Sequence, residues 1–110
     1  MKIETHAEQD CTVVAIHGSA DVNASAALRQ ALLGAIEAGR QRIICDLGDT
    51  DFICSDALGV LITAYLKARG RGGFVRLARP GERLKEIFQT TRLNCLFDMY
   101  SSMADAIKGR

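Results

Sequence analysis

The stretch Asp51-Phe52-Ile53-Cys54-Ser55-Asp56-Ala57-Leu58-Gly59-Val60-Leu61 decides how the rest of the chain is interpreted. Its apolar beginning is typical of a strand, and a strong helical pattern follows. The polar cluster between them is where a helix N-cap is expected, with Ser55 or Asp56 as the cap. A hydroxyl there lies beside unpaired backbone N–H groups and the positive end of the helix dipole. We therefore predict that Ser55 is a regulatory hydroxyl at a strand–helix junction.

The composition is that of one folded domain, which we expect to occupy residues 1–110. Hydrophobic residues make up 48% and charged residues 25% of the chain. The formal net charge is +1 and there is no Trp, so neither nucleic acid nor an anionic membrane is an expected partner. The first residues are polar and no apolar run is long enough to span a bilayer, which indicates a cytoplasmic protein.

Hydrophobic periodicity predicts an alternation of strands and helices. Helical spacing of apolar residues covers 22–38, 57–69, 82–90 and 101–108, and the first of these helices is expected to have Asp21 or Asn23 as its cap. Short apolar or alternating runs predict strands at 1–8, 11–17, 42–47 and 74–78, with a last one near 96–100. Turns are expected at 9–10, 18–21, 48–51 and 70–73. The predicted fold is α/β: a single domain with a small mixed sheet and helices packed against it.

The residue pattern does not support an enzyme, and we expect no cofactor. Ser55 lacks a Gly-x-Ser-x-Gly elbow, and His6 and His17, the only histidines, lie on the first two strands. Four scattered cysteines without a Cys-x-x-Cys pair make a metal site unexpected; we predict buried or half-buried free thiols at Cys11, Cys45, Cys54 and Cys95.

The remaining polar features have ordinary interpretations. The clustered acids Asp49, Asp51 and Asp56 are expected to be solvated carboxylates. Basic residues between 67 and 83 form either a solvated rim or a patch for an acidic partner. Two interpretations remain open for Ser55 itself: a plain N-cap, or a phosphate acceptor whose added charge would lie beside Asp56.

Several short motifs nevertheless occur together in a specific order. They are Gly18-Ser19-Ala20-Asp21, Asp46-Leu47, Phe52 to Leu61, Arg71-Gly72-Gly73, Arg76-Leu77, Thr91-Arg92-Leu93 and Leu96-Phe97. In this order and spacing the chain resembles the STAS domain family, and most closely its single-domain bacterial anti-sigma factor antagonists.

The resemblance implies a partner-switching role. Such an antagonist binds an anti-sigma factor, a serine kinase with an ATP-binding fold, and so releases a sigma factor. The kinase phosphorylates the serine that matches Ser55, and a phosphoserine phosphatase reverses this. The partner-binding residues it implies are Asp21, Asn23, Cys54, Ser55, Asp56, Leu58 and Gly59. The alternative is a STAS adaptor subunit of a signalling or transport complex that is never phosphorylated.

Three residues around the serine differ from the family pattern. Cys54 replaces an acidic residue, Asp56 replaces Ser or Thr, and Ala57 replaces Gly. The first two changes move a negative charge from one side of Ser55 to the other.

Overall fold

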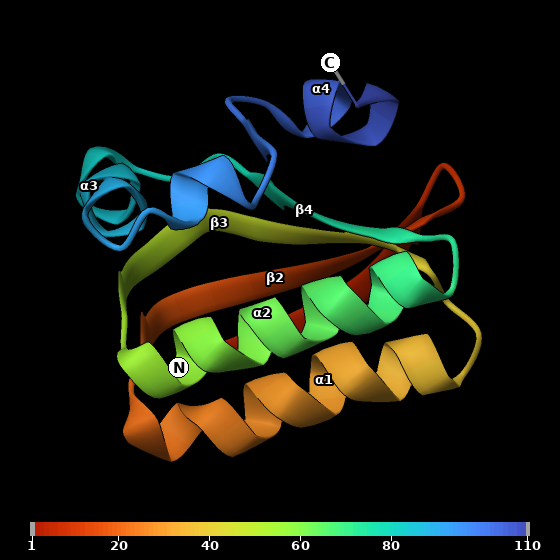
Figure 1. Ribbon diagram of the computed structural model, residues 1–110, viewed down its shortest axis with the longest axis horizontal. Coiled ribbons are helices and arrows are strands. Elements are labelled where there is room, and N and C mark those ends of the chain that lie inside the picture. Colours follow the sequence, from red (N-terminus) through yellow and green to blue (C-terminus); the bar gives the residue numbers. More distant parts are fainter. Residues whose placement is uncertain (1, 110) are drawn as a thin grey trace.

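A five-stranded mixed sheet forms the centre of the molecule, with helices on both sides of it (Figure 1). The computed structural model describes residues 2–109, so Met1 of the predicted first strand lies outside the described residues. In chain order the elements are β1 (Lys2–Glu8), β2 (Cys11–Ala20), the 3-10 turn η1 (Val22–Ala24), α1 (Ser25–Glu37), β3 (Arg42–Ile53), α2 (Ser55–Gly70), β4 (Phe74–Ala78), α3 (Glu82–Thr90), the 3-10 turn η2 (Leu93–Cys95), β5 (Met99–Tyr100) and α4 (Met103–Lys108).

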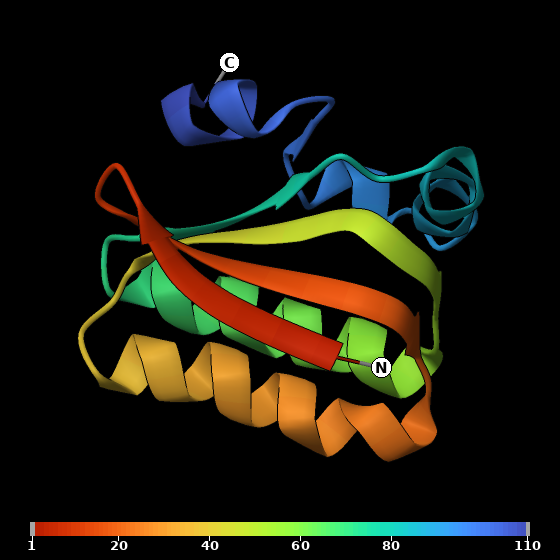
Figure 2. The ribbon, with the colours of Figure 1, turned by 180° about the vertical axis from the view of Figure 1, so that it is seen from behind.

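The strands follow one another across the sheet in the order β1-β2-β3-β4-β5. β1 and β2 are antiparallel, and every later pair is parallel. The predicted turn between β1 and β2 is confirmed. Gln9 and Asp10 have φ of 47° and 68°, a left-handed pair that is typical of two-residue hairpin loops. Figure 2 shows β1 running along the outside of the sheet next to β2.

The two faces of the sheet have separate cores because successive strand residues point in opposite directions. α1 and α2 lie side by side along one face, and Leu28, Leu32 and Ile36 of α1 are fully buried there. The other face is covered by α4, whose Ala106 packs in a small cluster with Cys11, Val13, Ile44 and Ala78. Ile43 and Ile44 illustrate the alternation, since each belongs to a different core.

Two predicted turns are wrong, because β2 and β3 continue through them. Gly18 to Ala20 still pair with β3, and residues 48–51 belong to β3. The pairing shifts register twice, between Ala15 and His17 and between Gly18 and Ser19. Thr50 is buried in this extension, and its hydroxyl donates to the carbonyl of Ile16 at 2.7 Å. The longer strands carry the chain out to the end of the sheet at which α2 begins.

Other elements agree more closely with the prediction from the sequence. The helix α3 and the strand β4 have the predicted bounds. Gly39 follows α1 with a φ of 92°, as expected of a residue that ends a helix. The first helix differs at its start. Asp21 caps η1, its Oδ1 accepting the N–H of Ala24 at 3.1 Å, and α1 proper begins only at Ser25.

Candidate functional site

The ends of β2 and β3 meet at the start of α2, and we call this place the junction (residues 20–25 and 52–58). Ala20 and Ile53 are paired strand residues, and the N–H of Cys54 donates to the carbonyl of Ala20 at 2.9 Å. The side chains of Ser25 and Cys54 approach to 3.8 Å. The loop containing Asp21 is therefore held directly beside the first turn of α2.

Cys54 is the N-cap of α2. Its backbone is extended (φ −85°, ψ 170°) and its Sγ accepts the N–H of Ala57 at 3.5 Å, while its carbonyl accepts the N–H of Leu58 at 2.9 Å. The prediction that Ser55 or Asp56 caps the helix is therefore wrong. The cap lies one residue earlier because β3 ends at Ile53 and Cys54 is the last extended residue before the helix.

Because Cys54 and not Ser55 accepts the capping hydrogen bond, the hydroxyl of Ser55 is not used to cap the helix. Ser55 is the first residue of α2 and is exposed. Among residues 2–109, no hydrogen bond involves its Oγ. Asp56 follows it in the first turn, also exposed, where a negative charge complements the helix dipole. Ala57 is completely buried in ordinary helical backbone, so this turn does not use the conformational freedom of the family's glycine.

The other residues predicted to bind a partner differ in accessibility. Asp21 and Asn23 are exposed beside the junction, and Cys54 and Gly59 are half-buried. Leu58 points into the core and only 8% of it is exposed. The structure thus brings Asp21, Cys54 and Ser55 together at the junction. Leu58 instead packs into the hydrophobic core under the same helix.

Two apolar residues at the junction were not predicted as site residues. Val22 is 65% exposed and Phe52 is 40% exposed, and among the described residues the other exposed large apolar side chain is Leu66 of α2, at 56%. Phe52 also borders a shallow pocket of about 340 Å³ whose other lining residues come from α3 and its end. The alternation of strand side chains could have revealed Phe52, because Ile53 next to it faces the core.

Three of the basic residues between 67 and 83 make contacts within the fold. Arg79 makes two hydrogen bonds to the carboxylate of Asp46, at 2.9 and 2.8 Å. Arg71 donates to the carbonyl of Ile36 at 2.8 Å, and the guanidinium of Arg76 lies 3.5 Å from the ring centre of Phe74. Arg71 and Arg79 remain exposed while they make these contacts, and Lys67, Arg69 and Arg83 are exposed as well, as expected of a solvated rim.

The Asp46–Arg79 pair shifts the pKa of both groups. Partial burial opposes ionisation of Asp46, but the hydrogen bonds from Arg79 and Gly48 and the positive charge of Arg79 outweigh it and lower the pKa of Asp46. The same pair raises the pKa of Arg79. Burial, helped by the neighbouring Asp46 charge, raises the pKa of the Cys45 thiol to about 12, so this thiol stays protonated.

The cysteines follow the prediction with one exception. Cys11 and Cys45 are buried and Cys54 is half-buried, but Cys95 is exposed on η2. Within residues 2–109, no three His, Cys, Asp or Glu side chains form a group that could hold a metal ion. No helix in this same part of the chain has the length and apolar character needed to cross a membrane.

Comparison with known proteins places this fold in a family. The STAS domain family model matches residues 2–106. The anti-sigma-B factor antagonist of Bacillus subtilis is 33% identical over 86 residues, which are 78% of this chain and 78% of that protein. A candidate anti-sigma factor antagonist of Thermotoga neapolitana is 29% identical over 70 residues, 64% of this chain, and the match spans only 62% of its length.

A solved structure with the same fold carries a modification. The Bacillus cell fate determinant SpoIIAA in its phosphorylated form has a TM-score of 0.77 and 20% identity, with 98% of each chain covered. At that identity the likeness concerns the fold alone. The family match over residues 2–106, together with the Bacillus subtilis relative, establishes the family. The chain therefore belongs to the STAS domain family.

Proposed function

We propose that this chain is an anti-sigma factor antagonist that binds an anti-sigma factor of the serine-kinase type, thereby releases a sigma factor, and is controlled by phosphorylation of Ser55. The observation that carries the proposal is an exposed serine hydroxyl at the start of α2, at the same junction as the exposed apolar side chains of Val22 and Phe52. The relative named anti-sigma-B factor antagonist supports it.

The junction has the make-up of a small contact surface. Val22 and Phe52 supply apolar area that gains free energy when it is removed from water. The exposed polar residues Asp21, Asn23 and Asp56 belong to the same junction. An apolar centre with a polar rim is the usual anatomy of a protein–protein interface.

Phosphorylation at Ser55 would change this surface without unfolding the domain. A phosphate adds a charge of about −1.5 to −2 at neutral pH. The N-terminus of α2 favours an anion, and the capping bond from Ala57 is made by Cys54, so the helix stays intact. A partner would instead have to desolvate this anion next to Asp56, at a cost of several kcal/mol. We therefore expect a loss of affinity of about 100-fold or more.

Phosphorylation of Ser55 also implies how the switch is reversed and in which compartment it works. The phosphate ester is the only covalent change, so a phosphoserine phosphatase restores the original contact surface. A kinase reaction that consumes ATP and the release of a sigma factor both require the cytoplasm, so the proposal includes a cytoplasmic location.

The test combines phosphate mapping with binding. The chain is incubated with ATP and each purified candidate anti-sigma kinase from the same genome, and the phosphate is located by mass spectrometry. We expect phosphate on Ser55, none on Ser55→Ala, and normal labelling of Ser101→Ala, a control at another exposed serine. Calorimetry should then show that only the unmodified chain binds its kinase tightly. Phosphate found only at other positions, or a Ser55→Ala chain that ATP still releases from the kinase, would refute the switch.

The alternative is a constitutive STAS adaptor. It is favoured by one observation, the acidic Asp56 that already gives the junction a permanent negative charge. Ser55→Asp separates the two proposals: an adaptor keeps its partner affinity in this variant, and a phosphorylation-controlled antagonist loses it.

A further inference from the structure

The outer edge of β1 lies apart from the junction. β1 is the first strand of the sheet and is paired on one side, with β2. In the sheet formed by the described residues, the other side of β1 offers a row of backbone N–H and C=O groups without a strand partner. Such an edge can accept another strand.

The hairpin determines which residues offer those groups. Glu8 and Cys11 flank the two-residue loop and form the hydrogen-bonded pair that closes it, and such pairs alternate with non-hydrogen-bonded pairs along an antiparallel ladder. The even-numbered residues of β1 therefore direct their backbone groups toward β2. Those of Ile3, Thr5 and Ala7 point outward.

We propose that a second copy of this chain occupies the edge, with the two β1 strands antiparallel about a twofold axis at Thr5. Thr5 then lies opposite Thr5 of the second copy, and Ile3 lies opposite Ala7. All seven residues of β1 are paired, and the outward backbone groups are the ones that bond. The twofold uses both edges at once, so the assembly closes as a dimer.

The charges of β1 favour this register. It places Lys2 opposite Glu8 and Glu4 opposite His6, each twice in the dimer. These pairs fall at non-hydrogen-bonded positions, where opposite side chains are closest. The four side chains are between 41% and 73% exposed in the single chain. A twofold at Glu4 would bring Glu4 against itself, and a twofold at His6 would bring Glu4 against Glu8, so these neighbouring registers are disfavoured.

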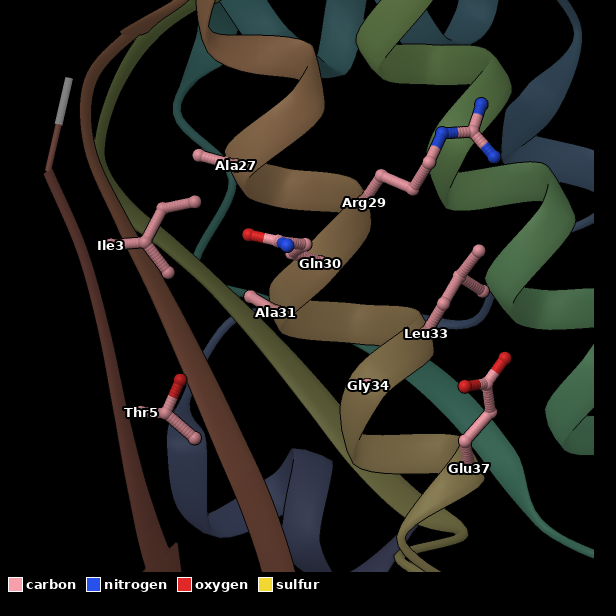
Figure 3. Close-up of a pocket in the computed structure, with 9 residues that line it drawn as sticks. All are labelled: Ile3, Thr5, Ala27, Arg29, Gln30, Ala31, Leu33, Gly34 and Glu37. Atoms are coloured by element: carbon pink, nitrogen blue, oxygen red, sulfur yellow. The ribbon is translucent and has the colours of Figure 1, made fainter.

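The face of β1 that carries no charge also suits a second copy. Ile3 and Thr5 border an open groove of about 810 Å³ between β1 and α1. Figure 3 shows the side chain of Ile3 lying toward the side of α1 that carries Ala27 and Ala31. Small residues such as these, with Gly34 farther along the helix, let another copy approach closely. The junction is at the ends of β2 and β3, so the dimer presents two junctions to partners.

Sedimentation equilibrium from micromolar to millimolar concentration tests the dimer directly. We expect the mass to rise from 11.9 kDa toward twice that value as concentration increases. Thr5→Pro removes an outward N–H, and proline is tolerated on an edge strand in that position. This variant should keep the circular dichroism spectrum of the folded chain and remain a monomer. A monomeric parent chain at millimolar concentration, or a dimer that survives Thr5→Pro, would overturn the proposal.

Charge exchange tests the register. Lys2→Glu places two carboxylates opposite each other and should weaken the dimer roughly tenfold. Adding Glu8→Lys to the same chain restores opposite charges and should restore the affinity. Lys67→Glu, on the exposed face of α2, is the matched control and should leave the dimer unchanged. If the double variant is no tighter than Lys2→Glu alone, the register proposed here is wrong.

Discussion

Replacing Cys54 with serine should stabilise the fold. Its Sγ accepts the N–H of Ala57 at 3.5 Å, and sulfur is a weak acceptor, whereas serine is among the best N-cap residues. An oxygen cap contributes about 1 kcal/mol relative to alanine. Because the thiol already supplies part of this, we expect Cys54→Ser to raise the free energy of unfolding by about 0.5 kcal/mol and Cys54→Ala to lower it by a similar amount.

Thermal and urea unfolding under reducing conditions measure this difference. For a domain of this size, 0.5 kcal/mol corresponds to a change in Tm of about 2–4 °C. Cys95→Ser is the matched control, since Cys95 is exposed and its removal should leave the Tm unchanged. If the serine and alanine variants of Cys54 unfold at the same temperature, the side chain at this position does not cap α2.

Three further predictions concern other parts of the molecule. Folding lowers the pKa of Asp46, so its ionised form stabilises the fold at neutral pH. This contribution is complete above the ordinary carboxyl pKa of about 3.9 and is lost as the pH falls through the lower pKa of the folded state. Asp46→Asn should therefore lower the Tm at pH 7, by an amount corresponding to about 1 kcal/mol, and its difference in Tm from the parent chain should shrink as the pH is lowered below about 3.9, as unfolding curves at a series of pH values will show. Gly73→Ala should cost about 2–3 kcal/mol in urea unfolding, because a Cβ there would collide with the backbone carbonyl of Gln41; unchanged stability would contradict that close approach. Phe52→Ala should weaken kinase binding about tenfold in calorimetry while the Tm stays within a few degrees, and equal affinities would exclude Phe52 from the contact surface.

The parts of the fold that could be predicted are those determined by local sequence. The helices 57–69 and 82–90 show apolar spacing that no strand shares, and the structure has helices there. Residues 74–78 are a short apolar run between a glycine-rich turn and a proline, and they form β4. Both signals lie within a few residues of the element that they predict.

The extension of β3 could not be predicted, because it depends on long-range pairing. Residues 48–51 are Gly-Asp-Thr-Asp, a composition typical of turns. They form strand because β2 continues beside them, and because the hydroxyl of Thr50 satisfies the carbonyl of Ile16 across the register shift. β2 and Ile16 are both far from residues 48–51 in the sequence, so the local pattern contains no signal of this pairing.

In the junction, too, some features could be predicted from the local sequence and others could not. Ser55 was identified from its place between an apolar strand and a helical pattern, and the structure puts it at that junction. The identity of the cap was missed because cap signals in sequence are oxygen-bearing side chains, and Cys54 caps with sulfur. The exposure of Val22 was missed because it depends on η1, a 3-10 turn that takes the place of the first turn of the expected helix.

The separation of cap and hydroxyl has a consequence for the proposed switch. Had Ser55 been the cap, phosphorylation would have modified the oxygen that accepts the capping N–H, and would have changed the cap of α2 as well as the surface. With Cys54 as the cap, the two effects are independent. Phosphorylated and unmodified chains should therefore have nearly equal stability but very different affinity for the partner. A large loss of stability on phosphorylation would mean that the switch acts through the fold of α2 and not through charge at its surface.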